Sequence, residues 1–197
     1  MAPEHPFPAA LNDGDVTLSW IKANADSLGV DADRIAIGGA SAGGALAAGL
    51  ALRIRDAGGA PPRAQLLIYP ALDDRTNTLS MAEFYRHAPW DGERTEKMWR
   101  IYLNGDQSAV SPYAAPARAT DFSGLGTTYI MTAEEDPLRD EAILYAQRLL
   151  ESGVTVELHH FARTFHGFDV LAPEASLTTS ALREQSAFLR RELAGNH

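Results

Sequence analysis

One segment constrains the fold of this chain more than any other: residues 34–44, which read Arg-Ile-Ala-Ile-Gly-Gly-Ala-Ser-Ala-Gly-Gly. A short apolar run with two isoleucines ends at paired glycines and passes at once into a segment rich in alanine and leucine. The first part is typical of a buried strand and the second of a buried helix. Ser41 lies at the junction, so the segment predicts a sharp strand-to-helix turn with a serine at its tip.

The alternation of strand and helix patterns continues along the chain. Apolar residues at helical spacing predict four helices, at about 9–25, 42–55, 140–152 and 173–193. Short apolar runs predict four strands, at 34–37, 65–69, 127–132 and 155–161. Because strands alternate with helices, we expect an α/β fold with a mostly parallel sheet of about four strands. The length of 197 residues predicts a single domain over 1–197.

Between residues 71 and 119 the alternation of strand and helix patterns is less regular, and the segment is rich in aromatic residues, Pro, Asp and Gly. We expect a helical excursion here, with short helices at about 80–86 and 95–102. The aromatic side chains of such a segment either pack on the sheet or face a substrate. The sequence favours neither alternative.

The composition excludes several kinds of partner and site. A formal charge of −9 argues against nucleic acid or an anionic membrane surface as a partner. The absence of cysteine excludes disulfides and thiol chemistry. The six histidines follow no metal-ligand pattern, so we expect neither a metal nor an organic cofactor. No apolar run approaches a membrane span and no signal peptide opens the chain, so the expected location is cytoplasmic.

Ser41 lies within Gly39-Ala40-Ser41-Ala42-Gly43, a G-x-S-x-G nucleophile elbow. Small residues at Gly39 and Gly43 leave room for the strained turn that exposes the serine. The alternative is a glycine-rich turn that only packs tightly or binds a phosphate. The two nucleotide-binding patterns fail, since the glycines do not fit G-x-G-x-x-G and no Gly-Lys-Ser/Thr follows.

Two further residues follow predicted strands at their carboxyl ends, where catalytic groups of parallel sheets gather. Asp136 comes after the strand at 127–132, and His166 comes after the strand at 155–161. The order Ser, Asp, His is that of a hydrolase triad, with Ser41 as nucleophile, His166 as base and Asp136 orienting the imidazole.

The sequence contains other carboxylates near Asp136, and each has another possible role. The residues at the start of the following helix, Asp140 and Glu141, are expected to cap its free N–H groups. The acids that precede Asp136, Glu134 and Glu135, are the alternative partners of His166.

Six blocks of the chain resemble, in order, those of the bacterial hormone-sensitive-lipase-like esterases (family IV). They are residues 1–10 (with Ala-Pro-Glu-His-Pro-Phe-Pro), 38–44, 69–73, 111–113, 136–141 and 165–168. The resemblance implies an α/β-hydrolase fold and hydrolysis of small-molecule carboxylic esters with short acyl chains. It also implies the Ser41, Asp136 and His166 triad and an oxyanion-hole N–H at Ala42. Ala40 departs from the Asp of many members, outside the triad.

One family block has no counterpart here. Members of that family carry an H-G-G-G loop upstream of the serine, which supplies a second oxyanion N–H. Met1 stands where the family has Leu, which indicates an assigned start, and we expect a truncated hydrolase fold. The strand at 34–37 then becomes an open sheet edge that self-associates or is covered by the terminal segment. The rival interpretation is a non-catalytic or poorly active fragment that needs a partner to complete the sheet and the oxyanion hole.

Overall fold

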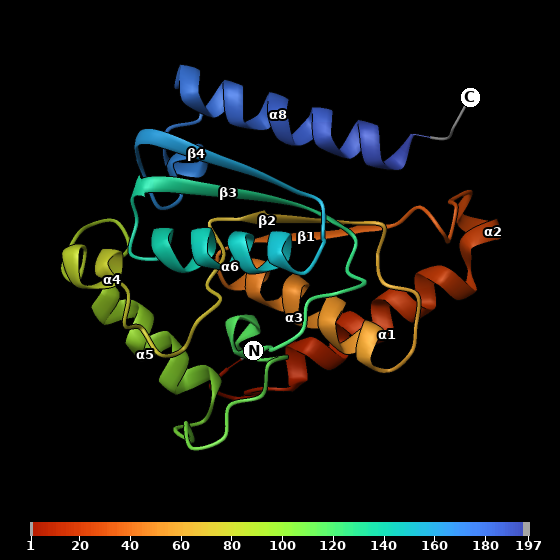
Figure 1. Cartoon of the computed structure of the whole chain (residues 1–197), viewed down its shortest axis with the longest axis horizontal. Coiled ribbons are helices and arrows are strands. Elements are labelled where there is room, and N and C mark those ends of the chain that lie inside the picture. Colours follow the sequence, from red (N-terminus) through yellow and green to blue (C-terminus); the bar gives the residue numbers. More distant parts are fainter. Residues whose placement is uncertain (1, 195–197) are drawn as a thin grey trace.

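The computed structural model describes residues 2–194, so Met1 and the interpretation of it as a start lie outside the described residues. Its strands form one sheet of four parallel strands in the order β1-β2-β3-β4 (Figure 1). They are β1 (Ala36–Ala40), β2 (Ala64–Ile68), β3 (Thr127–Glu135) and β4 (Val156–Phe165). The prediction of a mostly parallel α/β sheet is confirmed.

Helices separate the strands as the periodicity predicted. They are α1 (Ala9–Ala23), α2 (Ala25–Leu28), α3 (Ala42–Asp56), α4 (Leu79–Glu83), α5 (Gly92–Tyr102), the short 3-10 helix η1 (Pro116–Arg118), α6 (Arg139–Glu151), α7 (Phe168–Leu171) and α8 (Ser176–Leu193). The final helix expected at 173–193 begins at Ser176 as α8, and a separate short helix, α7, lies before Pro173. Pro173 lies between them, and a residue before proline avoids the helical conformation.

The strand bounds differ from prediction in a way that matters for the site. The first strand was expected at 34–37, but β1 extends to Ala40. Its glycines lie in the strand because β1 approaches β2 closely: a Cβ on Gly38 would lie 2.8 Å from the carbonyl oxygen of Leu66. The last strand was expected to end at 161, but β4 continues to Phe165. As a result, Ser41 directly follows β1 and His166 directly follows β4.

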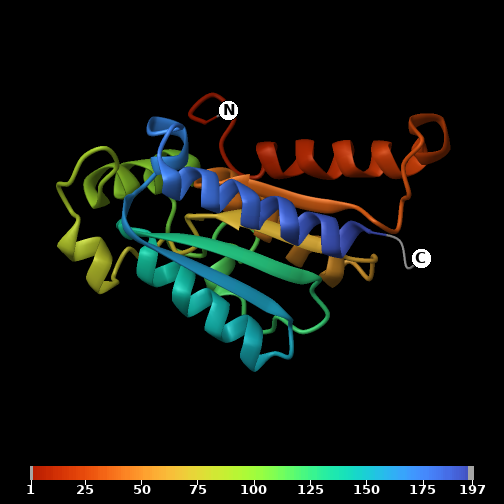
Figure 2. The same ribbon diagram turned by 90° about the horizontal axis from the view of Figure 1, so that it is seen from above.

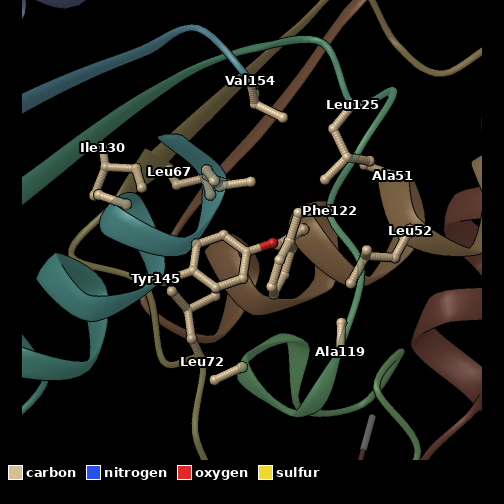
Figure 3. Close-up of a cluster of buried hydrophobic side chains, with 14 of the residues drawn as sticks. Ala51, Leu52, Leu67, Leu72, Ala119, Phe122, Leu125, Ile130, Tyr145 and Val154 are labelled. Atoms are coloured by element: carbon tan, nitrogen blue, oxygen red, sulfur yellow. The ribbon is translucent and has the colours of Figure 1, made fainter. Parts of the chain in front are cut away.

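Helices cover both faces of the sheet. α3 and α6 contact one face, while α8 packs on the other (Figures 1 and 2). Between the sheet and the first pair of helices lies a buried cluster in which the rings of Phe122 and Tyr145 meet edge to face, 5.2 Å apart (Figure 3). This cluster fixes α3 and α6 against β2 and β3.

The predicted open edge is present at β1. Among residues 2–194 no strand pairs with its outer side. The proline-rich lead-in packs elsewhere: the Phe7 N–H donates to the Tyr102 carbonyl at 2.9 Å, and the two rings lie 5.9 Å apart. Beside the edge, a hollow of about 440 Å³ between α1, β1 and α3 is lined mainly by apolar side chains, including Leu18, Ile21 and Ile37. Within the described residues, no helix has the length and hydropathy needed to span a bilayer.

Candidate active site

Ser41 lies at the turn between β1 and α3. Its backbone has φ 56° and ψ −121°, a conformation that L residues rarely adopt. Such a conformation costs about 1–3 kcal/mol and persists only where neighbours hold it. Two backbone hydrogen bonds do so: the Ser41 N–H donates to the Ile68 carbonyl at 2.8 Å, and the Ala71 N–H donates to the Ser41 carbonyl at 3.2 Å. The end of β2 therefore fixes the position of the serine.

The two glycines of the elbow are in different surroundings. A Cβ on Gly39 would overlap the backbone carbonyl of Gly43, one turn further along the chain. A Cβ on Gly43 would meet no heavy atom within 4 Å. Close approach across the turn therefore requires glycine at position 39, whereas position 43 has room for a side chain.

The three residues predicted to act together lie in hydrogen-bonding contact. The Ser41 Oγ is 3.0 Å from the His166 Nε2, and the His166 Nδ1 is 2.8 Å from the Asp136 Oδ2. An ionised carboxylate can only accept, so Nδ1 carries the proton of the neutral ring. Nε2 is then free to accept the hydrogen of the serine hydroxyl.

Asp136 is held in place by its own loop. Its side chain is fully buried, and its Oδ1 accepts the Leu138 N–H at 2.9 Å. The alternative acids are engaged elsewhere, since Glu134 accepts the Arg163 N–H and Glu135 contacts the His87 imidazole. Asp136 is thus the carboxylate that contacts His166.

The capping role expected for Asp140 and Glu141 is wrong. Leu138, the N-cap residue of α6, makes no side-chain capping bond. The Asp140 carboxylate accepts the Ser80 N–H at 2.8 Å, and the Ser80 Oγ accepts the Asp140 N–H at 3.1 Å. Glu141 accepts the N–H groups of Leu72 and Asp73, at 2.6 and 3.2 Å. Both acids therefore join α6 to the segment after β2, contacts that helix position alone does not predict. Burial raises the pKa of Glu141 well above its usual range, although the two N–H groups oppose this shift.

Two aromatic side chains contact the imidazole, and the sequence pattern predicted a role for neither. The Tyr69 ring centroid lies 4.6 Å from that of His166, and the Trp90 ring centroid lies 5.9 Å away. The Trp90 Nε1–H donates to the Thr95 Oγ1 at 2.9 Å, which holds the indole at the start of α5. The sequence placed Tyr69 at the end of the strand expected at 65–69 and in the family-like block 69–73, and assigned it no role.

A cavity of about 600 Å³ opens beside Ser41. Ala42, Ala71 and Trp90 line its end nearest the serine, and side chains of α5 line the rest, including Met98 and Ile101. The aromatic side chains of the excursion at 71–119 lie in two settings. Trp90 lines the cavity, while Trp99 lines it and is also buried at 1% exposure among residues of the core.

The N-terminus of α3 points into the same region. Ala42 is its first residue, and the first N–H groups of a helix have no partner within the helix. Together with the helix dipole, such groups favour negative charge. The Ala42 N–H is therefore suited to an oxyanion that forms beside Ser41.

Of the other described histidines, His5 lies in the lining of the cavity, and His87 contacts Glu135. His159 pairs with Glu184 at 2.7 Å and stacks on Tyr129, while His160 contacts the Thr132 hydroxyl at 3.0 Å. In the part of the chain that the structure describes, no group of three or more His, Asp or Glu side chains is arranged to hold a metal ion.

Known proteins resemble this chain over nearly all of its length. The model of a family with the α/β-hydrolase fold matches residues 1–170. Carboxylesterase NlhH of Mycobacterium tuberculosis (strain CDC 1551 / Oshkosh) is 38% identical over 200 residues, which cover 98% of this chain and 61% of that protein. Esterase LipI of Mycobacterium tuberculosis (strain ATCC 25618 / H37Rv) is 37% identical over 197 residues, which cover 99% of this chain and 61% of that protein.

Solved structures agree with the sequence comparison. The structure titled Bacterial Heroin Esterase superposes with a TM-score of 0.95 at 46% identity, covering 99% of this chain and 63% of that one. This chain thus spans about three fifths of the length of the relatives it matches. On its motifs, its fold and these matches, the chain belongs to the α/β-hydrolase fold family, in the hormone-sensitive-lipase-like branch that the sequence predicted.

Proposed function

We propose that this chain hydrolyses carboxylic esters, with Ser41 as nucleophile, His166 as general base and Asp136 as the residue that orients the imidazole. The observation that carries the proposal is the continuous contact from the Asp136 carboxylate through the imidazole to the serine hydroxyl. The names of the relatives, a carboxylesterase and esterases, support the same reaction class.

The reaction proceeds in two acyl transfers. The Ser41 Oγ attacks the ester carbonyl carbon while its proton passes to the His166 Nε2. The oxyanion that forms accepts the Ala42 N–H. The bond to the alcohol oxygen then breaks as His166 returns the proton to it, leaving an acyl group on Ser41. Water, deprotonated by the same imidazole, then attacks the acyl carbon. The bond from that carbon to the Ser41 Oγ breaks, His166 returns the proton to Oγ, and the acid is released. Asp136 stabilises the imidazolium in both steps.

The substrates we propose are uncharged esters with short acyl chains, and no cofactor takes part. The cavity beside Ser41, with Trp90 and Met98 in its lining, has room for a bulky apolar group on one side of the scissile bond. An acetate of an aromatic alcohol, such as p-nitrophenyl acetate, combines both features and is a suitable assay substrate.

A fluorophosphonate probe distinguishes this proposal from that of a non-catalytic fragment. The probe reacts only with an activated serine, so intact-mass analysis should find one adduct, on the peptide that carries Ser41. Asp136→Asn should slow the labelling, because the imidazole loses its correct tautomer. Folded protein that remains unlabelled after long exposure would favour the non-catalytic alternative.

The hydrolysis should depend on pH through the imidazole. A general base must be neutral to accept the serine proton, and imidazole side chains change charge between pH 5 and 8. We therefore expect kcat/KM for p-nitrophenyl acetate to rise through neutrality, followed at the isosbestic wavelength of the product. A rate that stays flat from pH 5 to 8 would argue against His166 as the base.

The open edge of β1 supports a second proposal, self-association with another copy of this chain. Unpaired backbone groups and the apolar hollow beside β1 both favour a partner. Light scattering should give a mass of at least two chains. The amides of Gly38 and Ala40, which alternate with those that face β2 and therefore point to the open edge, should exchange slowly. A monomer at high concentration whose β1 amides exchange freely would rule the association out.

A further inference from the structure

We propose that the hydrogen bond between Tyr69 and Asp169 positions the His166 imidazole, so that both are positioning residues of the site. The inference rests on the proposed function and adds two residues to it. Neither has a role in the transfer of the serine proton described above. Tyr69 contacts the ring that performs it, and Asp169 contacts Tyr69.

Tyr69 contacts the imidazole through its ring. It follows β2 directly, its ring centroid is 4.6 Å from that of His166, and the two planes are inclined by 60°. The residue is 3% exposed, and its N–H donates to the Met131 carbonyl at 2.7 Å. The Tyr69 backbone is therefore held between β2 and β3, and its buried ring packs against the imidazole.

The Tyr69 hydroxyl connects this ring to the segment that carries His166. It donates to the Asp169 Oδ1 at 2.7 Å, and Asp169 lies in the first turn of α7, three residues after His166. Burial, followed by the bond to Asp169, raises the pKa of Tyr69 above its usual range, so the hydroxyl keeps its proton and remains a donor. The bond therefore links the end of β2 to the start of α7 across 100 residues of sequence.

The chain needs such a link because a glycine comes directly after the histidine. Gly167 has φ 77°, a left-handed conformation that glycine adopts without strain. Glycine also permits many other conformations, so contacts beyond it must fix the one observed here. The Tyr69–Asp169 bond restrains the backbone that follows Gly167, on the side of the glycine away from His166. A displacement of about 1 Å in a reacting group can cost up to about 10²-fold in rate.

Tyr69→Phe tests the inference because it removes the hydroxyl and keeps the ring. We expect kcat for p-nitrophenyl acetate to fall about 5- to 30-fold with KM within about twofold, since the reacting geometry changes and the cavity does not. Asp169→Ala should give a similar loss, and Asp169→Asn, which keeps an acceptor for the hydroxyl, should retain most of the activity. The double variant Tyr69→Phe/Asp169→Ala should be no slower than the slower single variant.

Tyr145→Phe is the matched control. Tyr145 is also buried, at 1% exposure, but its hydroxyl has no hydrogen-bond partner among the described residues, and it lies in the cluster of Figure 3 rather than beside His166. This variant should keep the wild-type kcat. Equal kcat values for Tyr69→Phe and Tyr145→Phe would overturn the inference.

A proton resonance tests the positioning without relying on hydrolysis. A proton that donates to a carboxylate is strongly deshielded, so the His166 Nδ1–H should give a far-downfield signal that is missing in His166→Asn. The signal should broaden or disappear in Tyr69→Phe and remain in Tyr145→Phe. If wild-type protein shows the signal but neither hydrolyses esters nor reacts with the fluorophosphonate, the proposed function fails while this test stands. A signal unchanged in Tyr69→Phe contradicts the positioning role.

Discussion

Ser41→Ala is expected to lower kcat for p-nitrophenyl acetate by about 10⁴- to 10⁶-fold, because the variant has no atom that can form the acyl intermediate. The fold should be unaffected, since the backbone bonds of Ser41 to Ile68 and Ala71 do not involve its side chain. Removal of the hydroxyl should also abolish the fluorophosphonate adduct. Kinetics of purified wild type and variant, with the variant's circular dichroism and melting temperature, measure both effects.

A serine remote from the site provides the control for this variant. Ser186 is exposed on α8, and its hydroxyl donates to the Leu182 carbonyl within the same helix. Ser186→Ala should therefore keep the wild-type rate. Hydrolysis that persists unchanged in Ser41→Ala would exclude Ser41 as the nucleophile and, with it, the proposed function.

Gly39→Ala is expected to have the second-largest effect. Its Cβ would overlap the Gly43 carbonyl, and neither backbone can move without displacing the turn that carries Ser41. Overpacking of this kind costs about 1–3 kcal/mol of folding free energy. Movement of the nucleophile by about 1 Å should also lower kcat by about 10²-fold. Urea denaturation and steady-state kinetics separate these two consequences.

Gly43→Ala provides the comparison within the same elbow. The added Cβ meets no heavy atom within 4 Å, and alanine in a helix is favoured over glycine by about 0.5–1 kcal/mol. We therefore expect wild-type kinetics and equal or higher stability. Similar labelling rates for Gly39→Ala and Gly43→Ala would show that the steric account of the elbow is wrong.

The local sequence pattern was enough to predict the strand–helix alternation and the residues that meet at the site. Ser41, Asp136 and His166 each follow a predicted strand, and parallel strands bring their carboxyl ends to one edge of the sheet. Their mutual contact thus depends only on topology, which the apolar periodicity encodes. The exposed position of β1 was expected on other grounds, from the resemblance to a family whose members carry a further segment upstream of the serine.

The tertiary structure decided the contacts between segments remote in the chain. The bond from Tyr69 to Asp169 and those from Glu141 to Leu72 and Asp73 join residues 68 to 100 positions apart. No local periodicity records such a pair, which is why Asp140 and Glu141 were interpreted as helix caps. The different steric demands at Gly39 and Gly43 also follow only from the coordinates. They depend on how close the end of β1 comes to the first turn of α3, a distance set by packing of the whole sheet.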